Sequence, residues 1–139
     1  MDFSPRSGIA RIVVGLILVI GALRFSLFIT TYQHNPTLII DPDTLSYQYL
    51  SESIFEHGKY ERVAGIAEAH RPPLYPAYLA MNYAIFGKTN LLAPVILQHI
   101  MTLLIASMMA YLAYRLGGPV AAPLAALLYL TEFTSFYYA

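Results

Sequence analysis

The stretch IVVGLILVIGALRFSLFITT, from Ile12 to Thr31, decides the fold class of this chain. Its twenty residues carry a single charge, on Arg24. A helix needs about 20 apolar residues to cross a hydrocarbon core of about 30 Å. Arg6 and Arg11 precede the stretch with no acidic residue between them, so the positive-inside rule places the N-terminus in the cytoplasm. We therefore expect a membrane-spanning helix over residues 12–31.

Two questions about this first span stay open at the level of sequence. Arg24 lies about 18 Å along the helix from Ile12, so we expect it either to snorkel outward or to pair inside the protein. The charged start and the apolar core also fit a cleaved signal peptide. Arg24, Phe25 and Phe28 stand where small residues would precede a cleavage site. We interpret the segment as a retained signal anchor.

The composition of the whole chain also indicates a membrane protein. Of the 139 residues, 58% are hydrophobic and 12% are charged, whereas soluble domains have about 45–50% apolar and about 25% charged residues. The formal net charge is zero, so a basic surface for nucleic acid is not expected. The sequence has no cysteine, which excludes disulfides, thiolate metal sites and cysteine nucleophiles.

Two further apolar runs follow the first one. A second span is expected over residues 91–114, with Pro94 in its first turn and with Arg115 and a Gly-Gly-Pro turn at its end. A third span is expected over residues 119–138. Because the sequence stops inside this run, we expect the chain to be the N-terminal part of a longer protein. The predicted fold is an all-α membrane protein with about three transmembrane helices in a single membrane domain, residues 1–139.

Residues 32–90 form a large first loop, which in this orientation lies on the non-cytoplasmic side. The loop holds six of the eight acidic residues, and loops beyond about 15 residues usually carry structure or function. We expect one helix over residues 44–57, with Asp43 as its N-cap and Gly58 as its C-terminal cap. A second helix is expected over residues 74–86. Both are expected to lie at the membrane interface.

Two acidic residues at the base of this loop, Asp41 and Asp43, are the candidates for chemistry. A carboxylate there can take a proton from an acceptor hydroxyl or amine, or it can hold a divalent cation. The competing interpretations are a helix cap for Asp43 and a solvated turn for Asp41. The sequence has no zinc-type histidine pair, Gly-rich phosphate loop or Gly-x-Ser-x-Gly elbow. We therefore assign no metal ligand, and a divalent cation is the one cofactor left open.

A basic pair, His70 and Arg71, follows a stretch over residues 59–70 that we expect to be irregular. Two prolines come directly after the pair and stiffen the backbone. A stiff, basic site near the membrane can hold the phosphate of a lipid-linked donor. The competing interpretation is a positive pair beside anionic lipid headgroups.

Two motifs of this loop occur in a distinctive order. The first is Pro42-Asp43-Thr44 with Tyr47 four residues after the aspartate, and the second is Arg-Pro-Pro-Leu-Tyr-Pro over residues 71–76. With the preceding anchor and the short helix that follows, they resemble the N-terminal part of polyprenyl-phosphate-dependent GT-C glycosyltransferases. The nearest relatives in this resemblance are the family 39 protein O-mannosyltransferases and the lipid A aminoarabinose transferases.

The resemblance implies a polytopic protein of the cell inner membrane or the endoplasmic reticulum. Such enzymes take a sugar from a polyprenyl-phosphate donor on the non-cytoplasmic face and pass it to a lipid, glycan or protein acceptor. Asp43 matches the acidic residue that acts as general base or orients the acceptor, and Asp41 is the second choice. Members often carry two adjacent acidic residues, whereas one proline separates them here. We assign substrate positioning to Tyr47 and binding of the donor phosphate to Arg71 and His70.

Two other functions remain open. A small membrane scaffold or subunit would need no chemistry and would tolerate the removal of both Asp41 and Asp43. A fragment of a lipid-linked polymer ligase or polymerase would share the donor class without using Asp43 as a base. In the glycosyltransferase interpretation, the later helices would complete the donor cavity, so this stretch is not expected to catalyse alone.

Overall fold

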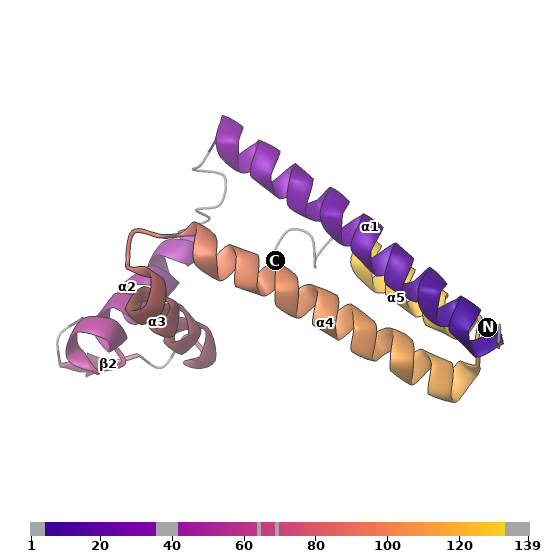
Figure 1. Cartoon of the computed structure of the whole chain (residues 1–139). Helices are drawn as coiled ribbons and strands as arrows, with labels where there is room; N and C mark the ends of the chain where they lie inside the picture. The colour runs from indigo at the N-terminus through magenta and orange to yellow at the C-terminus, as the bar shows by residue number, and fades with distance from the viewer. Residues whose placement is uncertain (1–4, 36–41, 64, 69, 133–139) are drawn as a thin grey trace. The chain divides into compact units, whose positions relative to one another are not determined.

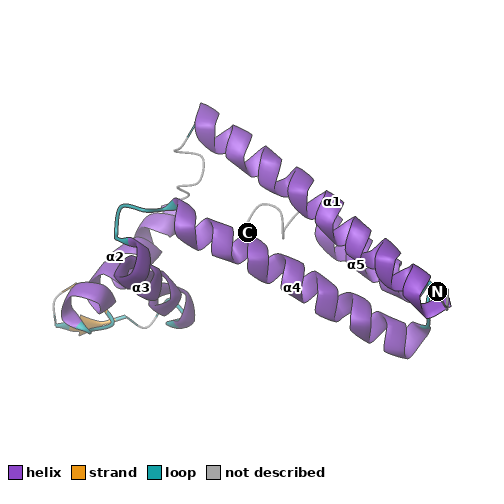
Figure 2. Ribbon diagram, viewed as in Figure 1, coloured by secondary structure: helices purple, strands orange, loops and turns teal. Residues whose placement is uncertain are grey.

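The computed structural model describes residues 5–35, 42–63, 65–68 and 70–132 (Figure 1). Helices dominate this part of the chain (Figure 2), which confirms the all-α class. The elements, in order, are α1 (Pro5–His34), α2 (Pro42–His57), β1 (Glu61–Val63), β2 (Ile66–Ala67), α3 (Leu74–Phe86), α4 (Leu92–Gly117) and α5 (Ala121–Thr131). The chain forms two compact units, residues 31–95 and residues 1–30 with 96–139. We call them the loop unit and the apolar unit.

The loop unit is built on the packing of α2 against α3. Leu50 and Ser51 of α2 are fully buried, and Leu79 and Tyr83 of α3 are nearly so. The ring of Tyr83 also meets Phe55 edge-on, with centroids 6.3 Å apart. Each helix buries one apolar stripe, which is the usual way in which short helices gain stability. This pairing sets the positions of the polar side chains at both ends of α2.

Glycines end both helices of the loop unit, as expected of C-terminal caps. Gly58 has φ 66°, and its N–H donates to the carbonyl of Ile54 at 2.9 Å. Gly87 has φ 87° and donates to the carbonyl of Tyr83 at 3.0 Å. A side chain at a positive φ would be strained, so glycine suits both positions. The bounds of α3 coincide with the predicted residues 74–86.

Two expectations for the loop were wrong. Residues 59–70 are not wholly irregular, because β1 and β2 form a short antiparallel hairpin. Its turn contains Gly65 at φ 82°, whose N–H donates to the Glu61 carboxylate at 2.9 Å. Asp43 is not the N-cap of α2, because the helix begins at Pro42 and Asp43 lies in its first turn. The carboxylate of Asp43 has a different partner, described below.

The apolar unit has a core of small and aliphatic side chains. Its buried members come from three helices, α1, α4 and α5: Ile17, Ala106, Ala110, Ala126 and Leu130. The side chain of Leu103 approaches α1 closely, since a Cβ built on Gly21 would lie 2.7 Å from Leu103 Cδ2. Small residues of this kind let membrane helices approach one another and pack by van der Waals contact.

Arg24 pairs inside the protein, which answers one of the two questions about the first span. Its side chain is buried, and Nη1 donates to the carbonyl of Leu130 at 3.0 Å. Leu130 lies in the last turn of α5, where backbone carbonyls lack helical partners and carry partial negative charge. Arg24 therefore stabilises the C-terminal end of α5 from within the apolar unit.

Two helices, α1 and α4, are long and apolar enough to cross a membrane, over residues 8–34 and 92–117. Only 17% of the most apolar window of each is buried. A core helix of a soluble protein would bury most of this surface, so the exposed apolar residues favour a lipid environment. Helix α5 has 11 residues and is about 17 Å long. The rest of the third expected span, residues 133–138, lies outside the described residues.

Candidate functional site

The first turns of α2 carry two of the predicted site residues. Asp43 and Tyr47 are four residues apart in the helix, so their side chains lie on the same face. The side chain of Asp43 is 67% exposed. The position in the first turn suits a carboxylate, because free backbone N–H groups make the helix N-terminus electropositive.

Arg71 meets Asp43 directly, although 28 positions separate them in the chain. Arg71 Nη2 donates to Asp43 Oδ1 at 2.5 Å, and the Arg71 side chain is 30% exposed. The hydrogen bond and the positive charge of Arg71 lower the pKa of the Asp43 carboxyl. The same contact raises the pKa of Arg71. Two residues predicted from separate motifs thus form one ion pair, which we call the Asp43–Arg71 pair.

Aromatic side chains hold Arg71 in place on two sides. Its guanidinium carbon lies 5.2 Å from the centroid of the Tyr47 ring, within the range of a cation–π contact. The Tyr60 hydroxyl donates to the backbone carbonyl of Arg71 at 2.6 Å. The ring of Tyr47 in turn meets the ring of Tyr75 edge-on, with centroids 5.1 Å apart. Both the main chain and the side chain of Arg71 are therefore fixed.

A small cavity lies next to this aromatic group. Its volume is about 50 Å³, enough for water but too small for a sugar ring. The lining combines two polar side chains of α2 with apolar and aromatic groups of α3, of the turn before α4 and of its first residues: Thr44, Gln48, Tyr75, Leu79, Tyr83, Leu91 and Pro94. On the α3 side, the hydroxyl of Tyr78 donates to the carbonyl of Pro94 at 2.7 Å. Burial raises the pKa of Tyr78, which keeps its hydroxyl protonated.

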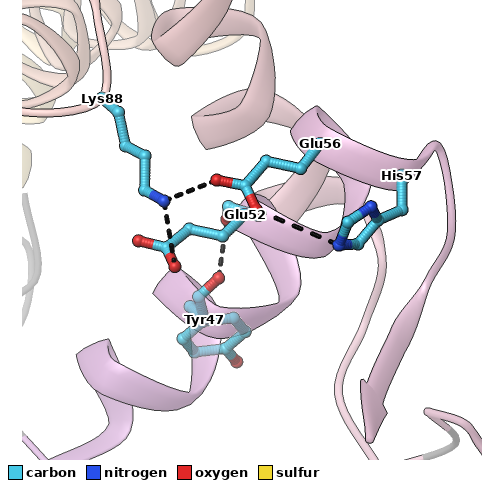
Figure 3. A network of polar contacts seen from close by, with 6 residues as sticks. Tyr47, Glu52, Glu56, His57 and Lys88 are labelled. Atoms are coloured by element: carbon cyan, nitrogen blue, oxygen red, sulfur yellow. Dashed lines mark hydrogen bonds and ion pairs between the residues drawn. The ribbon is translucent and has the colours of Figure 1, made fainter. Parts of the chain in front are cut away.

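A second ionic cluster lies at the other end of α2 (Figure 3). Lys88 Nζ lies 2.7 Å from Glu56 Oε1 and 3.4 Å from Glu52 Oε2. His57 Nε2 lies 4.0 Å from the other oxygen of Glu56. The hydrogen bond to Lys88 lowers the pKa of Glu56 and raises that of Lys88. We call these three residues, Lys88, Glu52 and Glu56, the Lys88 clamp, because they join the end of α2 to the turn after α3.

An open hollow of about 600 Å³ adjoins the Lys88 clamp. Its lining mixes acidic, basic and aromatic side chains of α2 and the hairpin: Tyr49, Glu52, Ser53, Glu56, His57, Lys59, Glu61 and Arg62. No sequence motif pointed to this hollow.

Among the described residues, the predicted site residue His70 does not join the Asp43–Arg71 pair. His70 is exposed, and its backbone N–H donates to Glu68 Oε1 at 2.7 Å. Asp41 lies outside the described residues. Among the described ranges, no group of three or more His, Asp or Glu side chains is placed to hold a metal ion. A divalent cation stays a prediction.

Two contributors to these sites were missed at the level of sequence. The sequence did not indicate a role for Tyr60, because its hydrogen-bond partner, the carbonyl of Arg71, lies 11 positions further along the chain. Lys88 did have a signal, since Glu52 and Glu56 repeat at a spacing of four and place two like charges together on one helix face. A cation from elsewhere in the chain was needed to balance them.

Comparison with known proteins adds no relative to this description. No protein-family model, no curated protein and no solved structure matches the chain. Function is therefore inferred from the residues and from the geometry of the Asp43–Arg71 pair.

Proposed function

We propose that this chain belongs to a membrane glycosyltransferase of the GT-C type, which transfers a sugar from a polyprenyl-phosphate donor to an acceptor on the non-cytoplasmic face. The single observation that supports it best is the Asp43–Arg71 pair. Asp43 and Arg71 belong to the two separate motifs of the loop, and their contact brings these motifs together. A carboxylate beside a guanidinium combines the two groups that such a transfer needs: one that accepts a proton and one that binds phosphate.

The proposed chemistry assigns one role to each residue. The acceptor hydroxyl oxygen forms a bond to the anomeric carbon of the donor sugar while its proton moves to Asp43. The bond between the anomeric carbon and the phosphate oxygen breaks, and its electron pair leaves with the polyprenyl phosphate. Arg71 stabilises the negative charge that develops on that phosphate. Tyr47 holds the guanidinium through its ring face and so acts as a positioning residue.

The proposed membrane topology is supported by the basic N-terminal sequence and by the packing of α1. The basic N-terminal segment favours a cytoplasmic N-terminus, which puts the loop unit on the opposite side with its polar residues. Helix α1 supplies Ile17 to the core of the apolar unit and Arg24 to the end of α5. Removal of α1 as a signal peptide would empty these positions. This supports a retained anchor in the inner membrane or the endoplasmic reticulum.

The test measures transfer of radiolabelled sugar in native membranes that carry the gene product. Synthetic polyprenyl-phosphate mannose and polyprenyl-phosphate aminoarabinose serve as donors. We expect Asp43→Asn to abolish the labelling of acceptors while leaving the expression level unchanged. The control variant is Glu61→Gln, because the amide oxygen can still accept the hydrogen bond from Gly65. This control should retain full transfer.

Three results would count against the proposal. Transfer by Asp43→Asn at the wild-type rate would remove the base role. Equal phenotypes of both variants and the wild type in the cell would favour a scaffold without chemistry. Wild-type membranes that label no acceptor from either donor would contradict the donor class.

A further inference from the structure

We infer that Arg71 is an exchangeable anion site: Asp43 occupies it when the site is empty of ligand, and a phosphate group displaces Asp43 and frees its carboxylate. The inference rests on the proposed function and adds a regulatory step to the same site. The carboxylate that is to act as base would be released only when the phosphate of the lipid carrier is in place. The displacement makes and breaks no covalent bond.

The two partners differ in how firmly they are held. Arg71 is fixed by the Tyr47 ring at 5.2 Å, by the Tyr60 hydroxyl at its carbonyl and by two prolines that follow it. Asp43 is 67% exposed against 30% for Arg71. Its carboxylate can turn into solvent and still be stabilised by the N-terminus of α2. Asp43 is therefore the partner that can leave the ion pair.

Phosphate is the ligand class that can take the place of Asp43. The contact between the pair joins one guanidinium nitrogen to one carboxylate oxygen. A guanidinium has a planar fork of donors, and it binds phosphate through two parallel hydrogen bonds. Such a bidentate contact is stronger than a single one and matches phosphate geometry.

Release of Asp43 changes its strength as a base. In the pair, the hydrogen bond and charge of Arg71 hold the pKa of Asp43 below its usual range. With Arg71 bound to phosphate, Asp43 loses that bond and faces a second negative charge, so its pKa rises. Among the described residues, the other titratable groups near Arg71 include Tyr47, Tyr60, the exposed His70 and Glu68, which interacts with Tyr60 and with the backbone of His70. Burial raises the pKa of Tyr60, so its hydroxyl stays protonated where a carboxyl titrates.

The experiment follows individual carboxyl groups by NMR in the 139-residue chain in lipid nanodiscs, with isotope-labelled aspartate and glutamate. The Asp43 signal is assigned by its loss in Asp43→Asn. The probes are farnesyl phosphate, inorganic phosphate and uncharged farnesol. We expect farnesyl phosphate to raise the titration midpoint of Asp43 by about one pH unit. An adjacent positive charge lowers the pKa of an aspartate by about 1–3 units, and the loss of Arg71 as partner should reverse a shift at the smaller end of that range. Farnesol should have no effect.

Glu56 is the matched control in the same spectra, because it is also an exposed carboxylate paired with a cation, Lys88, at 2.7 Å. Its midpoint should stay constant. In Arg71→Gln, the Asp43 midpoint should already be raised and should not respond to farnesyl phosphate. In Arg71→Lys, which keeps the charge without the fork, the response should be weaker.

The outcomes separate this inference from the proposed function. Farnesyl phosphate that binds, by phosphorus NMR, without moving the Asp43 midpoint would overturn the exchange, and so would a failure to bind. Equal movement of Asp43 and Glu56 would overturn it too, since a general charge effect would then explain both. An equal shift with inorganic phosphate would support the exchange and identify the ligand as phosphate without its lipid. Sugar transfer without the exchange would leave the proposed function intact, and exchange without transfer would contradict that function alone.

Discussion

Arg71 Nη2 lies 2.5 Å from Asp43 Oδ1 and so joins the residue before the two prolines that precede α3 to the first turn of α2. The two residues are 28 positions apart, and each was selected from the sequence for a different reason. Their contact places a group that can accept a proton, Asp43, next to a group that can bind an anion, Arg71. The contact also has consequences that can be measured without knowing the substrate.

The Asp43–Arg71 pair predicts a pH dependence of the stability of the loop unit. The pKa of Asp43 is lowered in the folded chain, whereas an aspartate in an unfolded chain has a pKa of about 3.9. The contribution of the pair is therefore fully present above that pH and is lost as the pH falls through the folded pKa. Thermal unfolding of wild type and Asp43→Asn should differ at pH 7, and the difference should shrink steadily as the pH falls from that of the unfolded carboxyl through the folded pKa. A constant difference over this range would contradict the prediction.

Tyr60→Phe tests whether the position of Arg71 depends on the hydrogen bond to its carbonyl. The variant removes the hydroxyl that donates at 2.6 Å and keeps the ring. A net hydrogen bond contributes about 0.5–1.5 kcal/mol, and we expect a loss of unfolding free energy at the lower end of that range. In the transfer assay, the donor KM should rise more than kcat falls. Tyr49→Phe is the control, because the Tyr49 side chain is exposed, and it should leave both constants unchanged.

Lys88→Gln should weaken the loop unit by leaving Glu52 and Glu56 without their common cation. Two carboxylates at a spacing of four repel each other on a helix face, so the variant should unfold at lower temperature at pH 7. The hydrogen bond to Lys88 lowers the pKa of Glu56. The stability that Lys88 contributes is therefore lost as the pH falls through the folded pKa of Glu56. The difference from wild type should also shrink as salt rises from about 0.05 to 0.5 M. Lys59→Gln, next to the C-cap, is the charge-matched control.

Gly21→Val tests the close approach of α1 to Leu103 in the apolar unit. A Cβ at this position would lie 2.7 Å from Leu103 Cδ2, so the valine must displace that side chain. Overpacking of this kind costs about 1–3 kcal/mol, measurable as unfolding in a detergent titration. Gly15→Val is the matched control, since nothing lies within 4 Å of a Cβ there. Equal stability of the two variants would show that α1 and α4 do not pack as described.

Much of the local structure could be predicted because it depends on signals close in the chain. The bounds of α3 follow from two prolines before it and Gly87 after it, and Gly58 ends α2 for the same reason. The short hairpin was missed because strands of three and two residues are too short to show the alternation that marks a strand. The N-cap of α2 was misplaced because Pro42 can itself occupy the first turn of a helix.

Sequence by itself determined the helical class, the apolar character of α1 and α4 and the ends of the loop helices, because each depends on composition or on residues within a few turns. Only the tertiary structure decided which charges meet. Asp43 reaches Arg71, Glu52 and Glu56 share Lys88, and Arg24 reaches the carbonyl of Leu130 because helix packing places distant residues together. A charged residue in sequence has many potential partners, and the packing of buried apolar faces selects one of them.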